Sequence, residues 1–207
     1  MPRIIVAKTE RGSGMFIKSL LGAAGLCLAA TSANAVTYGG FFSGANERPN
    51  AIVSAGTGYG TVEIIGGTIM KVNFTFSGLG TNLSGAHLHC CAATTGNGPV
   101  AVGFPALPLA KLGTYSRTFN LTQAIYGNGF LNPPTGDGTV ANARTRLLTG
   151  LASGRAYLNL HTTGVPGGEI RANLALVPEP ASWAMMVVGF GLVGGAIRRR
   201  SAALAAA

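Results

Sequence analysis

The stretch "GYGTVEIIGGTIMKVNFTF", residues 58–76, decides the fold because it has the pattern of a complete β-hairpin. From Met70 to Phe76 apolar residues alternate with polar ones, which is the period of a strand with one buried face. The segment before it also has strand character, and Gly66-Gly67 between the two segments suits a tight primed turn. The stretch therefore predicts two antiparallel strands.

Outward from this hairpin, the chain carries further strand-like segments and one helical segment. In "GTVANARTRLLTGLASG", residues 138–154, apolar residues recur at helical spacing before Gly154 ends the pattern. The turn-rich residues 126–138 are expected to form an exposed loop. Short strands separated by turns predict an all-β fold, either a β-sandwich of the Greek-key type or a barrel, with one short surface helix. The further strands are predicted over residues 37–43, 86–89, 99–102, 115–121, 156–161 and 169–176.

The N-terminal residues have the organisation of a secretion signal. Lys18 precedes the apolar run "SLLGAAGLCLAATSANA", which ends in the small-x-small pattern of Ala33 and Ala35. We expect a signal peptide over residues 1–35 that is removed on export, with Met15 as an alternative start of the chain.

The C-terminal stretch "VPEPASWAMMVVGFGLVGGAIRRR", residues 177–200, predicts a membrane anchor. Residues 181–197 are uncharged and largely apolar, and a helix of this length is at the short end of what crosses a bilayer. Three arginines follow, so the positive-inside rule places them and the tail, residues 201–207, in the cytoplasm. We therefore expect a transmembrane helix, with the preceding domain outside.

The order of these C-terminal features resembles the PEP-CTERM protein-sorting signal. The resemblance implies processing by an exosortase-type membrane enzyme in a Gram-negative bacterium that makes extracellular polysaccharide. The implied route is export across the inner membrane as a membrane-anchored precursor, followed by delivery to the cell surface or the extracellular matrix. The residues that carry the resemblance, besides the apolar run, are Pro178, Glu179, Pro180, Arg198, Arg199 and Arg200.

The net charge of +9 does not indicate a nucleic-acid-binding protein. Much of the charge lies in the two terminal signals. The basic residues between them are scattered, with neither a stripe nor interleaved aromatic residues. We therefore expect no nucleic-acid partner.

Between the two signals the chain runs through an ordered series of motifs. They are "SGANERPN", "GTGYGTVEI", "FSGLG", "GAHLHCC", "GNGPV" and "LASGRAYLNLHTTGVPGGEIRANL". This series resembles the CHRD domain, first noticed in chordin and common in secreted bacterial proteins. The resemblance spans nearly all of the expected mature domain, residues 36–176. It implies an immunoglobulin-like or superoxide-dismutase-like β-sandwich and names no reaction.

Two of the three histidines and two of the three cysteines lie in "GAHLHCC", residues 85–91. His87 and His89 are two apart on a predicted strand, so their side chains share a face. In "AYLNLHT" the same alternation places His161 on a polar face, and pairing of the two segments would bring three imidazoles together. Neutral imidazole suits copper or zinc, so one interpretation is a three-histidine metal site. Cys91 returns to the histidine face if the strand continues, which makes it the candidate fourth ligand.

Structural interpretations compete with the metal site. The histidines can hydrogen-bond to each other, to backbone carbonyls or to Asn159. Cys90 and Cys91 can bind metal, form a strained bridge with each other or pair with another molecule. Glu169 and Arg171 are expected to pair with each other or to cap loops.

The leading functional hypothesis is a non-enzymatic, exported CHRD-domain protein. It would act as a structural or interaction module toward extracellular polysaccharide or other surface proteins. The alternative is a copper- or zinc-binding extracellular protein with weak redox activity. Cu/Zn superoxide dismutases also have a His-x-His strand, but the expected mature chain lacks histidines for a second metal site, so dismutase activity is not expected. Polysaccharide recognition would use Tyr38, Tyr59 and Tyr126.

Overall fold

The computed structural model describes residues 35–133, 138–178 and 180–205. The expected signal peptide therefore lies outside the described residues, except for Ala35, which begins the first strand. Glu179 of the expected sorting signal is also outside them.

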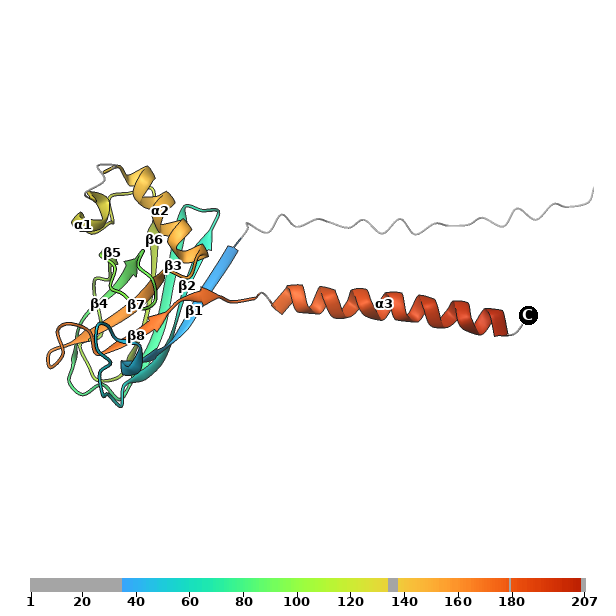
Figure 1. The fold of residues 1–207 in the computed structure, drawn as a ribbon, viewed down its shortest axis with the longest axis horizontal. Coiled ribbons are helices and arrows are strands. Elements are labelled where there is room, and N and C mark those ends of the chain that lie inside the picture. Colours follow the sequence, from blue (N-terminus) through green and yellow to red (C-terminus); the bar gives the residue numbers. More distant parts are fainter. Residues whose placement is uncertain (1–34, 134–137, 179, 206–207) are drawn as a thin grey trace, which may run out of the picture. The chain divides into compact units, whose positions relative to one another are not determined.

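In the described part of the chain, nine strands form one antiparallel sheet in the order β5-β4-β7-β8-β1-β2-β3-β6, with β9 paired to β1 (Figure 1). All the strands predicted from the alternating pattern are confirmed, and the expected final strand is divided into β8 and β9. The strands are β1 (Ala35–Ser43), β2 (Thr57–Ile65), β3 (Ile69–Ser77), β4 (Leu83–Cys90), β5 (Val100–Gly103), β6 (Gly113–Asn120), β7 (Ala156–Thr162), β8 (Ile170–Asn173) and β9 (Ala175–Leu176).

The β2–β3 hairpin forms with the expected register, in which Ile65 pairs with Ile69 and Thr57 with Ser77. Gly66 and Gly67 in the turn have φ angles of 56° and 67°. Positive φ at both central residues is the requirement of a type I′ turn, and glycine meets it without steric cost.

The predicted two-sheet sandwich is corrected to a single curled sheet. Strand β1 joins the two halves because it pairs with β2 on one side and with β8 and β9 on the other. Ser43 of β1 pairs with Arg171, and a Cβ on Gly40 would overlap the carbonyl oxygen of Asn173. Glycine in the middle of β1 therefore lets the second half of the sheet approach and bond to the first.

The inner faces of the two halves meet in a shared apolar core, which explains why the sequence has a sandwich pattern. A Cβ on Gly60 of β2 would lie only 2.5 Å from Leu158 Cδ1 of β7. Phe74 stacks on Tyr115 with ring centroids 4.9 Å apart, and both are buried. Tyr38, expected as an exposed aromatic, is also buried.

The predicted surface helix is confirmed as α2 (Val140–Ala152), which lies at one end of the sheet beside α1 (Asn128–Leu131) (Figure 1). The Thr139 side chain accepts a hydrogen bond from the Asn142 backbone N–H, which caps the helix. The expectation that residues 126–138 are fully exposed is wrong, because Tyr126 and Phe130 are buried. Their rings stack 6.0 Å apart and anchor α1 over the sheet.

The apolar C-terminal run forms helix α3 (Pro180–Ala205), as expected. Within the described residues, however, no helix has the length and apolar character needed to cross a membrane. The helix is confirmed and the membrane span is not. The remaining helical element, the 3-10 helix η1 (Gly44–Asn46), follows β1.

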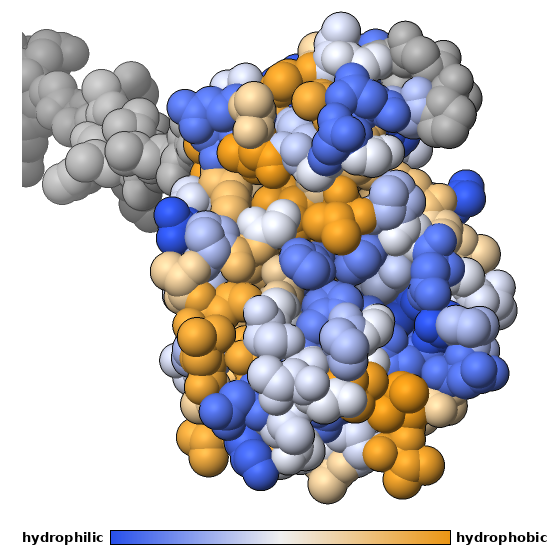
Figure 2. All heavy atoms as spheres, turned by 90° about the vertical axis from the view of Figure 1, so that its left-hand side faces the viewer, coloured by the Kyte–Doolittle hydropathy of each residue, from blue (hydrophilic) through white to orange (hydrophobic). Residues whose placement is uncertain are grey.

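Polar and apolar surfaces are interspersed on the face of the molecule drawn in Figure 2. Hydrophilic side chains gather in its centre and along its right side, between separate hydrophobic patches in the upper middle, at the left and at the lower right (Figure 2).

Gly150 of α2 packs directly on the sulfurs of Cys90 and Cys91, so we expect Gly150→Ala to destabilise the domain. An added Cβ would overlap both sulfur atoms. Overpacking of this kind costs about 1–3 kcal/mol. Gly129→Ala in α1 is the matched control, because a Cβ there meets nothing within 4 Å. Urea unfolding should show a lower midpoint for Gly150→Ala and an unchanged or raised one for Gly129→Ala. Equal midpoints would contradict the packing described for α2.

Candidate metal centre

The three histidines converge on one face of the paired strands β4 and β7, as their alternation predicts. His87 pairs with Asn159 and His89 with Tyr157 in the β4–β7 register, while His161 lies opposite Gly85. One ligand nitrogen from each histidine lies within 4.8 Å of the others. All three histidines are partly buried, so the cluster is partly shielded from solvent.

A hydrogen bond joins two of the imidazoles. His87 Nδ1 lies 3.0 Å from His161 Nε2, and His161 Nδ1 lies 2.9 Å from the Pro166 carbonyl oxygen. A carbonyl oxygen only accepts, so His161 carries its proton on Nδ1 and donates it to Pro166. His161 Nε2 is then an acceptor, and His87 Nδ1 donates to it.

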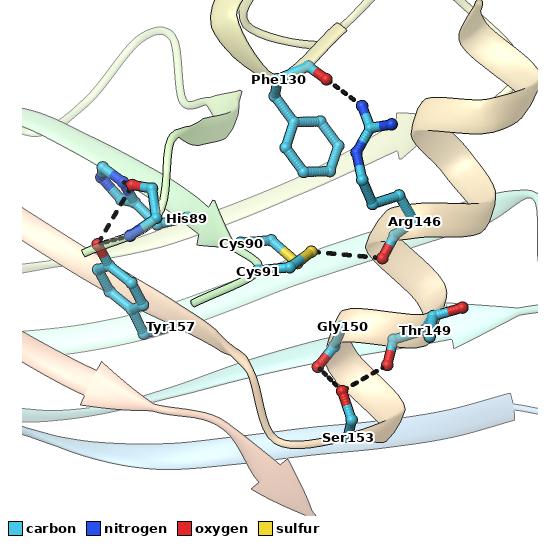
Figure 3. Close-up of a disulfide and its surroundings, with 10 residues drawn as sticks. His89, Cys90, Cys91, Phe130, Arg146, Thr149, Gly150, Ser153 and Tyr157 are labelled. Atoms are coloured by element: carbon cyan, nitrogen blue, oxygen red, sulfur yellow. Dashed lines mark hydrogen bonds between the residues drawn. A yellow bond between two sulfur atoms is a disulfide. The ribbon is translucent and has the colours of Figure 1, made fainter. Parts of the chain in front are cut away.

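The third histidine is oriented in the same way. His89 Nδ1 donates to the Gly98 carbonyl oxygen at 2.9 Å. The His89 ring stacks on the ring of Tyr157 with centroids 4.8 Å apart, and Figure 3 shows the two residues side by side. Its Nε2 is buried and has no hydrogen-bond partner among the described residues. A buried nitrogen lone pair without a partner is costly unless a ligand or water meets it.

Arg171 supports this arrangement from β8. Its guanidinium lies 3.4 Å from the centroid of the Tyr157 ring and donates to the Gly96 carbonyl oxygen at 3.0 Å and to Asn97 Oδ1 at 3.2 Å. These bonds hold the loop that carries Gly98, which is the acceptor for His89. Arg171 therefore acts on the cluster indirectly, through the Tyr157 ring and through the loop that carries Gly98. Its position in the sequence does not reveal this role.

Burial keeps the imidazoles neutral. Burial, assisted by the neighbouring His161, lowers the pKa of His87 to about 4. Burial also lowers the pKa of His89 to about 4, although the bond to Gly98 opposes this. The pKa of His161 is lowered by the same cause. Neutral imidazole is the form that binds metal, so the cluster needs to lose no charge before binding.

A buried acid hydrogen-bonds to Asn159, the residue that pairs with His87, and was not singled out from the sequence. Glu47, in the loop after η1, is only 3% exposed and accepts a hydrogen bond of 3.3 Å from Asn159 Nδ2. Burial raises the pKa of Glu47 from 4.5 to about 7, although Asn159 and Arg171 oppose the shift. Its position within the "SGANERPN" motif is the only signal in the sequence that points to it.

The structure separates Cys91 from the histidines, which corrects its expected place on their face. Strand β4 ends at Cys90, and the two adjacent cysteines form a disulfide with Cα atoms 3.2 Å apart. Cys91 Sγ faces α2, 3.4 Å from the Arg146 carbonyl oxygen (Figure 3). The cysteines therefore complete the packing of α2, and of the open alternatives the bridge between them is the one observed.

Glu169 and Arg171 do not pair with each other; each holds loops, as one of the expected alternatives states. Glu169 is buried and accepts hydrogen bonds from Ser54 Oγ at 2.7 Å, from the Gly80 N–H at 2.8 Å and from Thr162 Oγ1 at 2.7 Å. These bonds tie together three loops at the end of the sheet away from α2.

Comparisons with known proteins agree with the two resemblances in the sequence. The family model of the CHRD domain matches residues 41–174, which is more than half of the chain. The PEP-CTERM protein-sorting motif matches residues 176–200. No curated protein and no solved structure matches the chain.

The raised pKa of Glu47 predicts a pH-dependent gain in stability for Glu47→Gln. The wild-type carboxyl is neutral in the folded state below about pH 7, whereas the unfolded carboxyl ionises near 4.5. Its contribution to stability is therefore complete below pH 4.5 and is lost as the pH rises to 7. We expect Glu47→Gln to raise the unfolding free energy by about 1–3 kcal/mol at pH 8 and to change it little at pH 4.5.

Urea unfolding at the two pH values measures this difference. The matched control is Glu63→Gln, a partly exposed glutamate that pairs with Lys71 at 3.5 Å. It should change the unfolding free energy by less than about 0.5 kcal/mol at either pH. A Glu47→Gln protein that is less stable than the wild type at pH 8 would show that the buried carboxylate is charged and well paired.

Proposed function

The chain belongs to the CHRD-domain family, and on this premise we propose that it is an exported, non-enzymatic protein that binds one copper or zinc ion outside the inner membrane. The ligands in this proposal are His87, His89 and His161. The observation that carries it is the convergence of their three ring nitrogens within 4.8 Å.

The sorting motif supports the destination. A PEP-CTERM motif over residues 176–200 implies processing by an exosortase and sorting to the surface. The expected signal peptide starts the same route. The proposed final location is the cell surface or extracellular matrix of a Gram-negative bacterium, where extracellular polysaccharide and other surface proteins are available as partners.

The hydrogen bonds around the cluster favour a metal site. Backbone carbonyls hold the protons of His89 and His161 on Nδ1, which leaves both Nε2 atoms as ligands. Outer-shell bonds of this kind are typical of metal-binding histidines. Tetrahedral zinc with bonds of about 2.0–2.1 Å holds its ligand nitrogens roughly 3.3 Å apart. The 3.0 Å between His87 Nδ1 and His161 Nε2 is close to that spacing. For zinc to bind both nitrogens, the His87 proton must move from Nδ1 to Nε2, because a protonated nitrogen cannot be a ligand.

The chemistry of the ligands selects the class of metal. Three neutral imidazoles without a carboxylate suit copper or zinc and do not suit magnesium or calcium, which prefer oxygen. With Cys91 held in its disulfide, three protein ligands leave a fourth position for water. The proposed role is binding, without a catalytic step.

A second candidate is the same exported domain as a structural or interaction module without metal. The bond between His87 and His161 favours it, because two imidazoles and a carbonyl already satisfy each other there. Among the described residues, His89 Nε2 is then the one buried nitrogen of the three imidazoles that has no hydrogen-bond partner. Metal content separates the two candidates.

We expect the full-length protein, exported to the periplasm and dialysed, to retain about one copper or zinc ion per chain. Elemental mass spectrometry measures the ratio. His87→Gln and His89→Gln should lose the ion, because glutamine has no imidazole nitrogen to bind it. The glutamine amide still forms hydrogen bonds, which limits the damage to folding. Lys71→Gln on β3 is the control and should retain it.

Thermal unfolding of each protein with and without added zinc gives an independent result. Binding to the folded state should raise the midpoint of the wild type and of Lys71→Gln, and should leave the histidine variants unchanged. A folded wild type without metal, whose midpoint does not respond to zinc or copper, would leave the structural module as the function.

A further inference from the structure

The outer face of β2, β3 and β6, on the half of the sheet away from the histidines, carries an ordered polar array. The strand register places its residues in two rows that run across the three strands. Together they line a depression of about 340 Å³. The six residues of this array are Tyr59, Thr75 and Thr114 in one row and Thr61, Asn73 and Ser116 in the next.

The array offers hydrogen-bond donors and acceptors to solvent. Ser116 Oγ donates to Asn73 Oδ1 at 2.7 Å, which fixes the orientation of the amide. The two N–H donors of Asn73 then point to no other group in the described part of the chain, and the residue is exposed. Hydroxyl groups that both donate and accept surround it. Such a surface matches a ligand rich in hydroxyl groups.

An aromatic platform adjoins the array at one end. Phe41 of β1 is 76% exposed, and its ring centroid lies 4.8 Å from that of Tyr59. Tyr59 lies across Gly39, where a Cβ would come within 2.9 Å of the tyrosine Cζ, so the ring is held against the sheet. An exposed aromatic ring with a polar tip packs well against the C–H face of a sugar ring.

The charge of this face excludes an anionic partner. The next row holds Glu63 and Lys71, which neutralise each other in an ion pair of 3.5 Å. The six residues of the array are all uncharged. A nucleic acid or an acidic polymer would therefore find no complementary positive field here.

We infer that the polar array and its aromatic platform bind an extended, neutral polysaccharide chain. Strands in a sheet are about 4.8 Å apart, which is close to the length of one sugar unit, so successive units would meet successive strands. Tyr59 and Phe41 would pack on one sugar ring, while Asn73 and the hydroxyl groups bind the next ones. The inference goes beyond metal binding and does not depend on it, because the histidines lie on β4 and β7.

Affinity gel electrophoresis of the full-length protein tests the inference. The gels contain hydroxyethylcellulose, galactomannan, soluble β-1,3-glucan or, as an anionic polymer, alginate. We expect at least one neutral polymer to retard the wild type at least twofold. Any retardation by alginate comes from the net charge of +9 and should be the same for the wild type and for Tyr59→Ala. Tyr59→Ala and Asn73→Ala should abolish the retardation by the neutral polymer, because they remove the platform and the central amide.

Matched controls separate binding from folding and from the metal site. Thr75→Ala should weaken retardation, whereas Thr145→Ala, which alters an exposed threonine on α2, should not. His87→Gln should be retarded like the wild type, so loss of metal binding and loss of polysaccharide binding are distinguishable. The inference is overturned if no neutral polymer retards the wild type, if alginate alone does, or if Tyr59→Ala, folded by circular dichroism, is retarded normally.

Discussion

The antiparallel register between β4 and β7 is the constraint on which the candidate metal centre depends. It sets His89 opposite Tyr157 and brings His161 beside His87, although 74 residues separate the last two along the chain. A slip of one residue would turn every one of these side chains toward the apolar core. The buried residues between them, such as Leu88 and Leu158, are completely inaccessible and make that slip unfavourable. Core packing therefore specifies the geometry of the polar face.

Buried polar groups around the cluster hold the histidine rings in their orientations. Arg171 is 1% exposed, and its hydrogen bonds order the loop that supplies the carbonyl acceptor for His89. A buried arginine is costly unless it is paired and hydrogen-bonded, and here the Tyr157 ring and the loop carbonyls compensate it. This cost is reasonable for a site that must hold ring nitrogens in fixed directions, and it is hard to explain for a purely apolar sandwich strand.

Local periodicity was sufficient to predict the strands, helix α2 and the shared face of the three histidines. It was insufficient for features that depend on contacts between residues distant in the sequence. The closure of the sheet depends on Gly40 meeting Asn173, which no local pattern reveals. Cys91 leaves the histidine face because β4 ends at Cys90, one residue earlier than the alternating pattern predicts. Burial of Phe130, 1% exposed, depends on α1 docking against the sheet. The support from Glu47 and Arg171 is likewise visible only once the loops are placed.

The most direct test of the central claim is the protonation of the imidazole nitrogens, measured by long-range ¹H–¹⁵N NMR on the metal-free protein at pH 7. A preorganised metal site predicts neutral rings with the proton on Nδ1 for both His89 and His161, and a large shift of both Nε2 resonances when one equivalent of zinc is added. Protons on Nε2, or resonances that do not respond to zinc or copper, would contradict a preorganised metal site and would leave the cluster as a hydrogen-bonded part of the sheet.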